Sequence, residues 1–148
     1  MVSGTIRAFI CGASRSNAVI SVGLLLVVAI DMTLAPEAPY PASIQDANFA
    51  VRWLKANAAT WNGDGSKIGV YASSSGGHVA ELLALRPRDP RYTAIALPAG
   101  SPALDATVPC VIMSWPVINP LGRYRLAVRA RDGADACANA SVAASWPV

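Results

Sequence analysis

The residues of this chain best suited to chemistry form a short run of serines and glycines after Ala72. Ser74 stands two residues after Ala72 and two before Gly76, which is close to the Gly-x-Ser-x-Gly pattern of a nucleophile elbow. In such an elbow a strand turns sharply into a helix, and the serine sits strained at the turn. The pattern predicts that Ser74 is a nucleophile at the positive end of a helix, with the backbone N–H of Ser75 placed to bind a developing oxyanion.

The small residues on either side of Ser74 fit this interpretation. An elbow needs little side-chain volume two residues before and after the serine, because the strand and the helix approach each other there. Ala72 replaces the first glycine of the pattern and adds only one methyl group, while Gly76 and Gly77 leave the start of the helix open. A flexible loop is the alternative, since runs of serine and glycine are common in loops.

A base for this nucleophile is harder to find. The chain has one histidine, His78, four residues after Ser74 on the helix that would leave the elbow. The elbow turns the serine away from that helix, whereas a general base must reach the hydroxyl within hydrogen-bond distance. We therefore expect His78 to be a helix residue beneath the site and not the base. The acids considered as its partner have no other histidine to orient, namely Asp89, Asp105, Asp132 and Asp135.

The elements that would position Ser74 alternate along the chain. Apolar runs predict strands near 24–30, 67–72 and 108–115, and amphipathic spacing predicts helices near 44–59 and 76–85. The sequence Ser43-x-x-Asp46 has the form of a helix start. This order predicts an α/β fold of three layers, with a parallel sheet and flanking helices. Trp115 closes the last strand at the end where such sheets bind ligands; core packing is the favoured role and an acyl pocket the alternative.

A longer stretch around these elements resembles hormone-sensitive-lipase-like esterases. The similarity runs from a loop of the Asp-Tyr-Arg-Leu-Ala-Pro-Glu type to an elbow of the Gly-Asp-Ser-Ala-Gly-Gly type, best over 24–85. The matching residues are Asp31, Leu34, Ala35, Pro36, Glu37, Pro39, Pro41, Asp46, Ala47, Arg52, Trp53, Leu54, Gly63, Asp64, Ser66, Ile68, Ser74, Gly76 and Gly77.

This resemblance implies a partial α/β-hydrolase fold and the hydrolysis of small carboxylic esters by Ser74, with no cofactor and no metal. The family carries a His-Gly-Gly-Gly-type oxyanion loop before the Asp31 motif, but residues 1–30 hold only isolated glycines. Its triad acid and histidine lie far downstream of the serine, and no histidine follows His78. The alternative is therefore a truncated or frame-disrupted member without catalysis.

Composition narrows the remaining classes of function. The net charge of +3 arises in residues 1–30 and 121–148, while residues 31–120 carry six basic and seven acidic side chains. No basic face emerges, which argues against nucleic-acid binding. The three cysteines show no C-x-x-C spacing, so a reducing cytoplasmic compartment is expected.

The ends of the chain raise two further questions. Ala18–Ile30 is an uncharged run of thirteen residues, too short for a membrane span; we favour a strand over a secretory signal. We expect the partial hydrolase domain to occupy residues 1–125, and residues 126–148 to form an Ala-rich tail that packs poorly or lies outside the sheet. The oligomeric state stays open.

Overall fold

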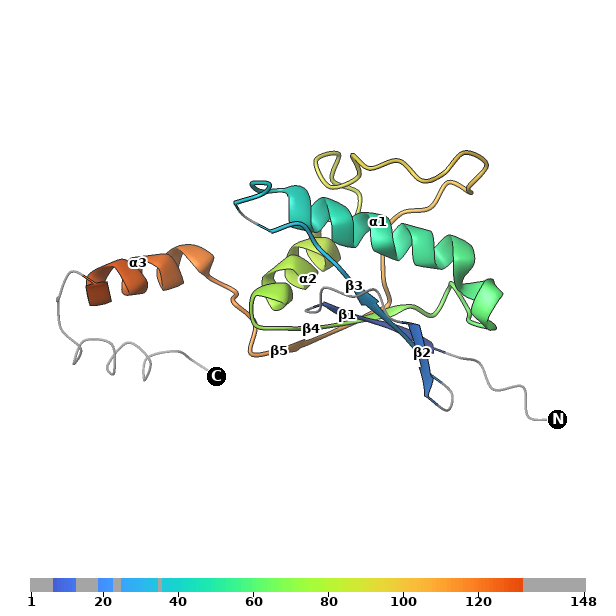
Figure 1. Cartoon of the computed structure of the whole chain (residues 1–148), viewed down its shortest axis with the longest axis horizontal. Coiled ribbons are helices and arrows are strands. Elements are labelled where there is room, and N and C mark those ends of the chain that lie inside the picture. The colour runs from blue at the N-terminus through green and yellow to red at the C-terminus, as the bar shows by residue number, and fades with distance from the viewer. Residues whose placement is uncertain (1–6, 13–18, 23–24, 35, 132–148) are drawn as a thin grey trace. The chain divides into compact units, whose positions relative to one another are not determined.

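The computed structural model describes residues 7–12, 19–22, 25–34 and 36–131 (Figure 1). The chain divides into two compact units, with the boundary between Pro116 and Val117. The first unit contains five strands and two α-helices among its described residues, and α3 belongs to the second. In chain order the elements are β1 (Arg7–Gly12), β2 (Val19–Val22), β3 (Leu25–Ile30), α1 (Ala42–Asn57), a 3-10 turn (Ala58–Trp61), β4 (Gly69–Ser73), α2 (Ser75–Leu85), β5 (Cys110–Ser114) and α3 (Pro120–Arg131).

The five strands form one sheet in the order β2-β3-β1-β4-β5. β1 pairs in parallel with both β3 and β4, and β4 pairs in parallel with β5. The three predicted strands correspond to β3, β4 and β5, so the prediction of a parallel α/β sheet is confirmed. Parallel strands end at the same edge, and the carboxyl end of β4 is where Ser74 follows.

Two strands of the sheet, β1 and β2, were not predicted from the sequence. β1 lies in the middle of the sheet, and β2 is a further strand that precedes the one predicted at 24–30 and pairs antiparallel with it. A short apolar run such as β1 gives little local signal, because its pairing partners lie far away in the sequence. No helix in the described ranges is long and apolar enough to cross a membrane.

The helix α1 presents the apolar face that its spacing predicts. Ile44, Ala47, Val51 and Leu54 are all buried. The predicted start is wrong in detail, because Pro41 occupies the N-cap position and no side chain caps the helix. Asp46 instead accepts a hydrogen bond from the backbone N–H of Thr33 at 2.7 Å, which joins the loop after β3 to the N-terminal half of α1.

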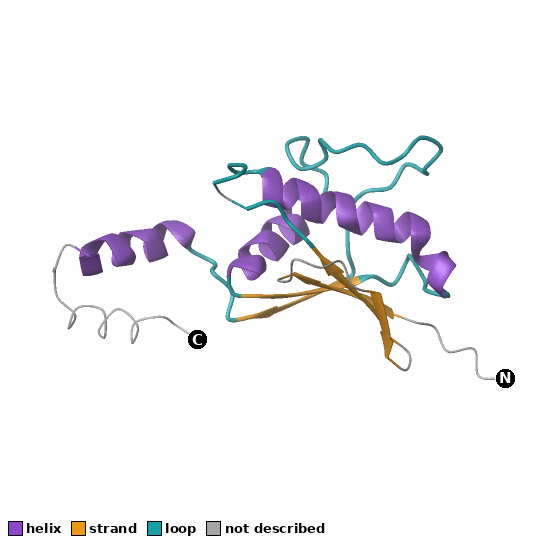
Figure 2. Cartoon of the chain, in the orientation of Figure 1, coloured by secondary structure: helices purple, strands orange, loops and turns teal. Residues whose placement is uncertain are grey.

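The core lies between the sheet and these helices. Val70 and Ala72 alternate on one face of β4, and that face packs with Val51 of α1 and with Ala80 and Leu83 of α2. α1 and α2 therefore cover the same face of the sheet (Figures 1 and 2). Among the described residues of the first unit, this gives two of the three expected layers.

The segment between α2 and β5 is tied to α1 by a buried arginine. Arg52 donates from Nε to Asn48 Oδ1 at 2.8 Å and from Nη2 to the carbonyl oxygen of Ile95 at 2.6 Å. Asn48 Nδ2 donates in turn to the carbonyl oxygen of Pro87 at 3.0 Å. Burial lowers the pKa of Arg52. These bonds fix a long connection that has no regular secondary structure of its own.

In the second unit the described residues form α3, Pro120–Arg131. The predicted tail begins at residue 126, inside this helix, and residues 132–148 lie outside the described residues. The domain limits 1–125 and 126–148 therefore stay a prediction.

Candidate active site

Ser74 lies at the junction of β4 and α2 in a backbone conformation that side chains rarely adopt. It is the N-cap residue of α2, with φ 51° and ψ −124°, and it is exposed. For a residue other than glycine such a conformation costs about 1–3 kcal/mol and persists only where the surrounding structure enforces it. The sharp strand-to-helix turn expected of an elbow is present at this serine.

Two contacts enforce the turn. The backbone N–H of Ser74 donates to the carbonyl oxygen of Ser114 at 3.0 Å, which extends the pairing of β4 with β5 by one residue. One turn into α2, a Cβ added to Gly77 would lie 2.6 Å from Pro116 Cβ, well inside van der Waals contact. The glycine at position 77 is therefore required by the close approach of α2 to the segment after β5.

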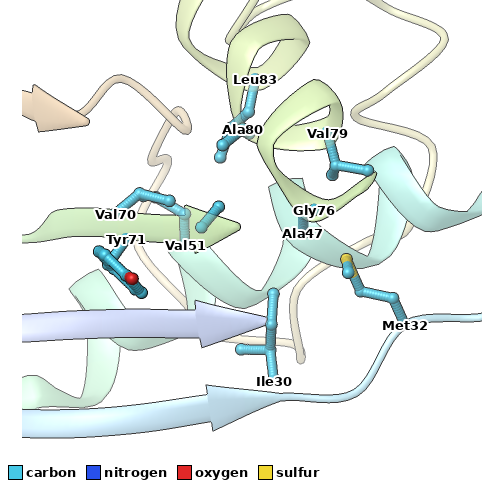
Figure 3. A pocket seen from close by; sticks show the side chains of 11 residues that line it. Ile30, Met32, Ala47, Val51, Val70, Tyr71, Gly76, Val79, Ala80 and Leu83 are labelled. Atoms are coloured by element: carbon cyan, nitrogen blue, oxygen red, sulfur yellow. The ribbon is translucent and has the colours of Figure 1, made fainter. Parts of the chain in front are cut away.

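Ala72 and Gly76 flank the serine as the elbow pattern requires. Ala72 is buried in the core of the first unit, where its methyl group packs instead of clashing. Gly76 borders a small apolar cavity of about 20 Å³ between the sheet and the two helices, lined with Ile30, Val51 and Val79 among others (Figure 3). A cavity of this size has room for about one water molecule, so it is not the place for an acyl chain.

The backbone at the start of α2 offers donors to an anion. Ser75 is the first residue of α2, and its N–H has no carbonyl partner one turn earlier in the helix. The N–H of Gly77 is already used, since it donates to the carbonyl oxygen of Ser74 at 3.1 Å. Gly12, the last residue of β1, lies opposite Ala72 of β4. β1 therefore ends at the edge of the sheet where Ser74 lies. Residues 13–18 are outside the described ranges.

His78 contacts its own helix. Its Nδ1 lies 3.5 Å from Glu81 Oε2, one turn later in α2, and both atoms are inaccessible to solvent and make no hydrogen bond. The contact is an ion pair when the imidazole is protonated. Within the described part of the chain, no hydrogen bond joins His78 to Ser74. The structure thus places the single histidine of the chain with Glu81, and not with the serine hydroxyl.

The acids that were considered as partners of a histidine are engaged elsewhere. Arg88 Nε lies 2.6 Å from Asp105 Oδ2, and this bond is the main cause that holds the pKa of Asp105 well below its usual range. The pKa of Asp89 is likewise lowered, chiefly by its hydrogen bond with Arg91. Asp132 and Asp135 lie outside the described residues. Among the described residues, no cluster of His, Cys, Asp and Glu suits a metal ion.

Trp115 does not pack in the core, which was its favoured role from the sequence. It follows β5 directly, its side chain is 88% exposed and its φ is 46°. The prediction of core packing is wrong, because the turn after Ser114 carries the indole out of the core. The sequence gives no signal for a positive φ at a bulky residue, since glycine or asparagine is expected there.

The chain matches known families and enzymes over much of its length. The BD-FAE family matches residues 12–112. Carboxylesterase NlhH from Mycobacterium tuberculosis is 47% identical over 64 residues, which cover 43% of this chain and 20% of that enzyme. Human hormone-sensitive lipase is 35% identical over 60 residues, or 40% of this chain and 6% of the lipase. The chain spans about a fifth of the length of the first of these relatives.

Solved structures share the fold. The esterase LipW from Mycobacterium marinum superposes with a TM-score of 0.52 at 25% identity, covering 77% of this chain and 36% of LipW. A bifunctional GH43-CE protein from Bacteroides eggerthii gives a TM-score of 0.58 at 25% identity, over 74% of this chain and 17% of that protein. With the match over residues 12–112, these similarities show that the chain belongs to the BD-FAE family, among the hormone-sensitive-lipase-like α/β-hydrolases.

Proposed function

We propose that this chain is a carboxylic-ester hydrolase whose nucleophile is Ser74. The observation that carries the proposal is the strained conformation of Ser74, with φ 51° between β4 and α2. Strain of this kind persists where function uses it, and here it presents a hydroxyl to solvent at the positive end of a helix. The esterase relatives that match part of this chain support the same lineage.

The proposed reaction is acyl transfer in two steps. Ser74 Oγ attacks the carbonyl carbon of the ester while the Ser74 proton passes to solvent, and the negative charge on the carbonyl oxygen is met by the N–H of Ser75. The alkoxide leaves and takes up a proton, and water then hydrolyses the acyl-serine. Because His78 contacts Glu81, no histidine of this chain activates the hydroxyl. The rate enhancement is then limited to the roughly 10³–10⁴ over water that oxyanion stabilisation and binding provide.

A non-catalytic member of the family is the second candidate. The position of His78 favours it, because Nδ1 of the single histidine lies against Glu81 on α2 and accepts or donates no hydrogen bond within the described residues. In this candidate the elbow is inherited from the family and the chain acts as a binding surface. The two candidates differ in whether Ser74 becomes acylated.

Hydrolysis of p-nitrophenyl acetate separates the two. We expect a slow release of p-nitrophenol above the buffer rate that is lost in Ser74→Ala. The matched control is Ser75→Ala, which removes the neighbouring exposed hydroxyl but keeps the backbone N–H. Equal rates in the wild type and Ser74→Ala would favour the non-catalytic candidate.

The proposed function includes a substrate class, the absence of a cofactor and a cellular compartment. Its substrate is a small acyl ester, which needs no cofactor in a serine mechanism. We place the reaction in the cytoplasm because the cysteines of the chain show no disulfide spacing. The balance of charge in residues 31–120 supports a small-molecule substrate over a nucleic acid.

A further inference from the structure

A second strained residue lies beside the elbow. Trp115 has φ 46°, and Ser74 has φ 51°. For a bulky side chain a positive φ is a genuine outlier, and such outliers gather at ligand-binding and catalytic sites. The two residues follow the carboxyl ends of adjacent strands, since Ser73 of β4 is paired with Ser114 of β5.

The neighbours of Trp115 in the chain are both fastened to the elbow. Ser114, the residue before it, accepts the hydrogen bond from the N–H of Ser74 at 3.0 Å. Pro116, the residue after it, packs so closely on Gly77 that only glycine fits there. The Cα of Trp115 is about 3.8 Å from that of Ser114 along the chain. The backbone of Trp115 is therefore held on both sides by contacts with the turn that carries Ser74.

The indole nevertheless finds no place in the core. Its side chain is 88% exposed, whereas Trp53 and Trp61 pack against each other with ring centroids 5.6 Å apart. A large rigid aromatic side chain gains much from burial, so a strained backbone that holds it in solvent gives up that stabilisation. These are the properties of a side chain that a ligand covers.

We infer that Trp115 is a positioning residue for the substrate: its indole packs against the apolar group of an ester whose carbonyl carbon lies at Ser74. This inference rests on the proposed function and adds the substrate class, namely esters with an aromatic or extended alkyl group. Loss of the indole weakens binding about tenfold, because the aromatic contact and the burial of apolar area are lost together.

The test uses binding, which does not depend on turnover. The probe is 4-bromophenylacetone, in which a CH₂ group replaces the ester oxygen of 4-bromophenyl acetate, so that it cannot be hydrolysed. Its affinity is measured by ligand-observed NMR with the full chain, and bromine quenching of indole fluorescence reports which tryptophan it covers. We expect saturable binding in the wild type, about tenfold weaker in Trp115→Ala and nearly unchanged in Trp115→Phe, with the quenching lost in both variants.

The matched control is Leu85→Ala, which removes another exposed apolar side chain (72% exposed) at the far end of α2. It should bind the probe like the wild type. Absence of saturable binding, equal affinity in Trp115→Ala, or equal losses in Trp115→Phe and Trp115→Ala would each overturn the inference. Failure of the proposed function is read separately, from hydrolysis by the wild type and Ser74→Ala, so that either can fail without the other.

Discussion

The backbone N–H of Ser74 donates to the carbonyl oxygen of Ser114 at 3.0 Å, so the strained residue of the elbow is held by the strand beside it. This bond explains how φ 51° is maintained at a residue with a side chain. The hydroxyl of Ser74 stays exposed while its backbone is fixed. The sharp turn at Ser74 therefore depends on the pairing of β4 with β5, and not on the Ser-Gly run alone.

The strain at Ser74 predicts an unusual order of stabilities. Glycine adopts a positive φ without steric cost, whereas alanine keeps the strain. We expect Ser74→Gly to be about 1 kcal/mol more stable to unfolding than Ser74→Ala, since relief of strain exceeds the added entropy of the unfolded chain. Urea denaturation measures both. Equal stabilities would mean that the conformation is not strained.

The second contact that holds the turn at Ser74 is the close approach of Gly77 to Pro116. A methyl group at this position would lie 2.6 Å from Pro116 Cβ and 2.8 Å from Pro116 Cα, so α2 or the segment after β5 must move. We expect Gly77→Ala to destabilise the chain by about 1–3 kcal/mol, as overpacking does. Ser75→Ala, an exposed position in the same turn, is the control and should change little. A neutral or stabilising Gly77→Ala would show that the two segments are not in close contact.

The central part of the fold was predictable from the sequence because its signals are local. The spacing of Ile44, Val51 and Leu54 marks the buried face of α1, and the strand before Ser74 is a plain apolar run. β1 was missed because its role comes from pairing with β3 and β4, which lie far along the chain. Pairing between distant strands leaves no periodicity that a short window of sequence shows.

The hydrogen bonds of Arg52 should contribute to the stability of the fold by holding the segment between α2 and β5. Replacing it by methionine keeps the apolar stem but leaves Asn48 Oδ1 and the carbonyl oxygen of Ile95 without their donors. Unpaired buried acceptors make Arg52→Met less stable by about 2–3 kcal/mol in urea denaturation. Arg86→Met, which alters a mostly exposed side chain 3.5 Å from Asp89, is the control. A loss as small as that of the control would contradict the buried network.

The lowered pKa of Asp105 predicts that the stability of the fold depends on pH. Its pKa is lowered first by the hydrogen bond from Arg88, then by the backbone N–H of Thr107. The carboxylate therefore stabilises the fold above the ordinary aspartate pKa of about 4, and this stabilisation is lost as the pH falls toward the lowered pKa. We expect Asp105→Asn to be less stable than the wild type at pH 7. The difference should shrink as the pH falls below about 4.

Arg88→Met provides the comparison for this pH dependence, because it removes one cationic partner of Asp105, leaves Lys55 in place and keeps the carboxylate. Its stability should also approach that of the wild type at low pH. A constant difference between Asp105→Asn and the wild type from pH 7 to pH 3 would show that the ion pair does not lower the pKa.

The candidate site was predictable only in part. The elbow pattern predicted a sharp turn at Ser74, which the structure has, because that geometry demands small residues at fixed positions; the role of Ser74 as a nucleophile stays a prediction. Trp115 was assigned to the core, since a turn with positive φ at tryptophan follows from the contacts of Ser114 and Pro116 and not from the residue type. The ion-pair contact of His78 with Glu81 is a helical i, i+3 pair, which the spacing alone allows but does not require.

The most direct test of the account is labelling with a fluorophosphonate probe, mapped by mass spectrometry in the wild type, Ser74→Ala and His78→Ala. We predict slow labelling confined to Ser74, absent in Ser74→Ala, and at the same rate within about twofold in His78→Ala, because His78 contacts Glu81 and not the serine. Labelling at another residue, or rapid labelling of Ser74 that His78→Ala abolishes, would contradict the account.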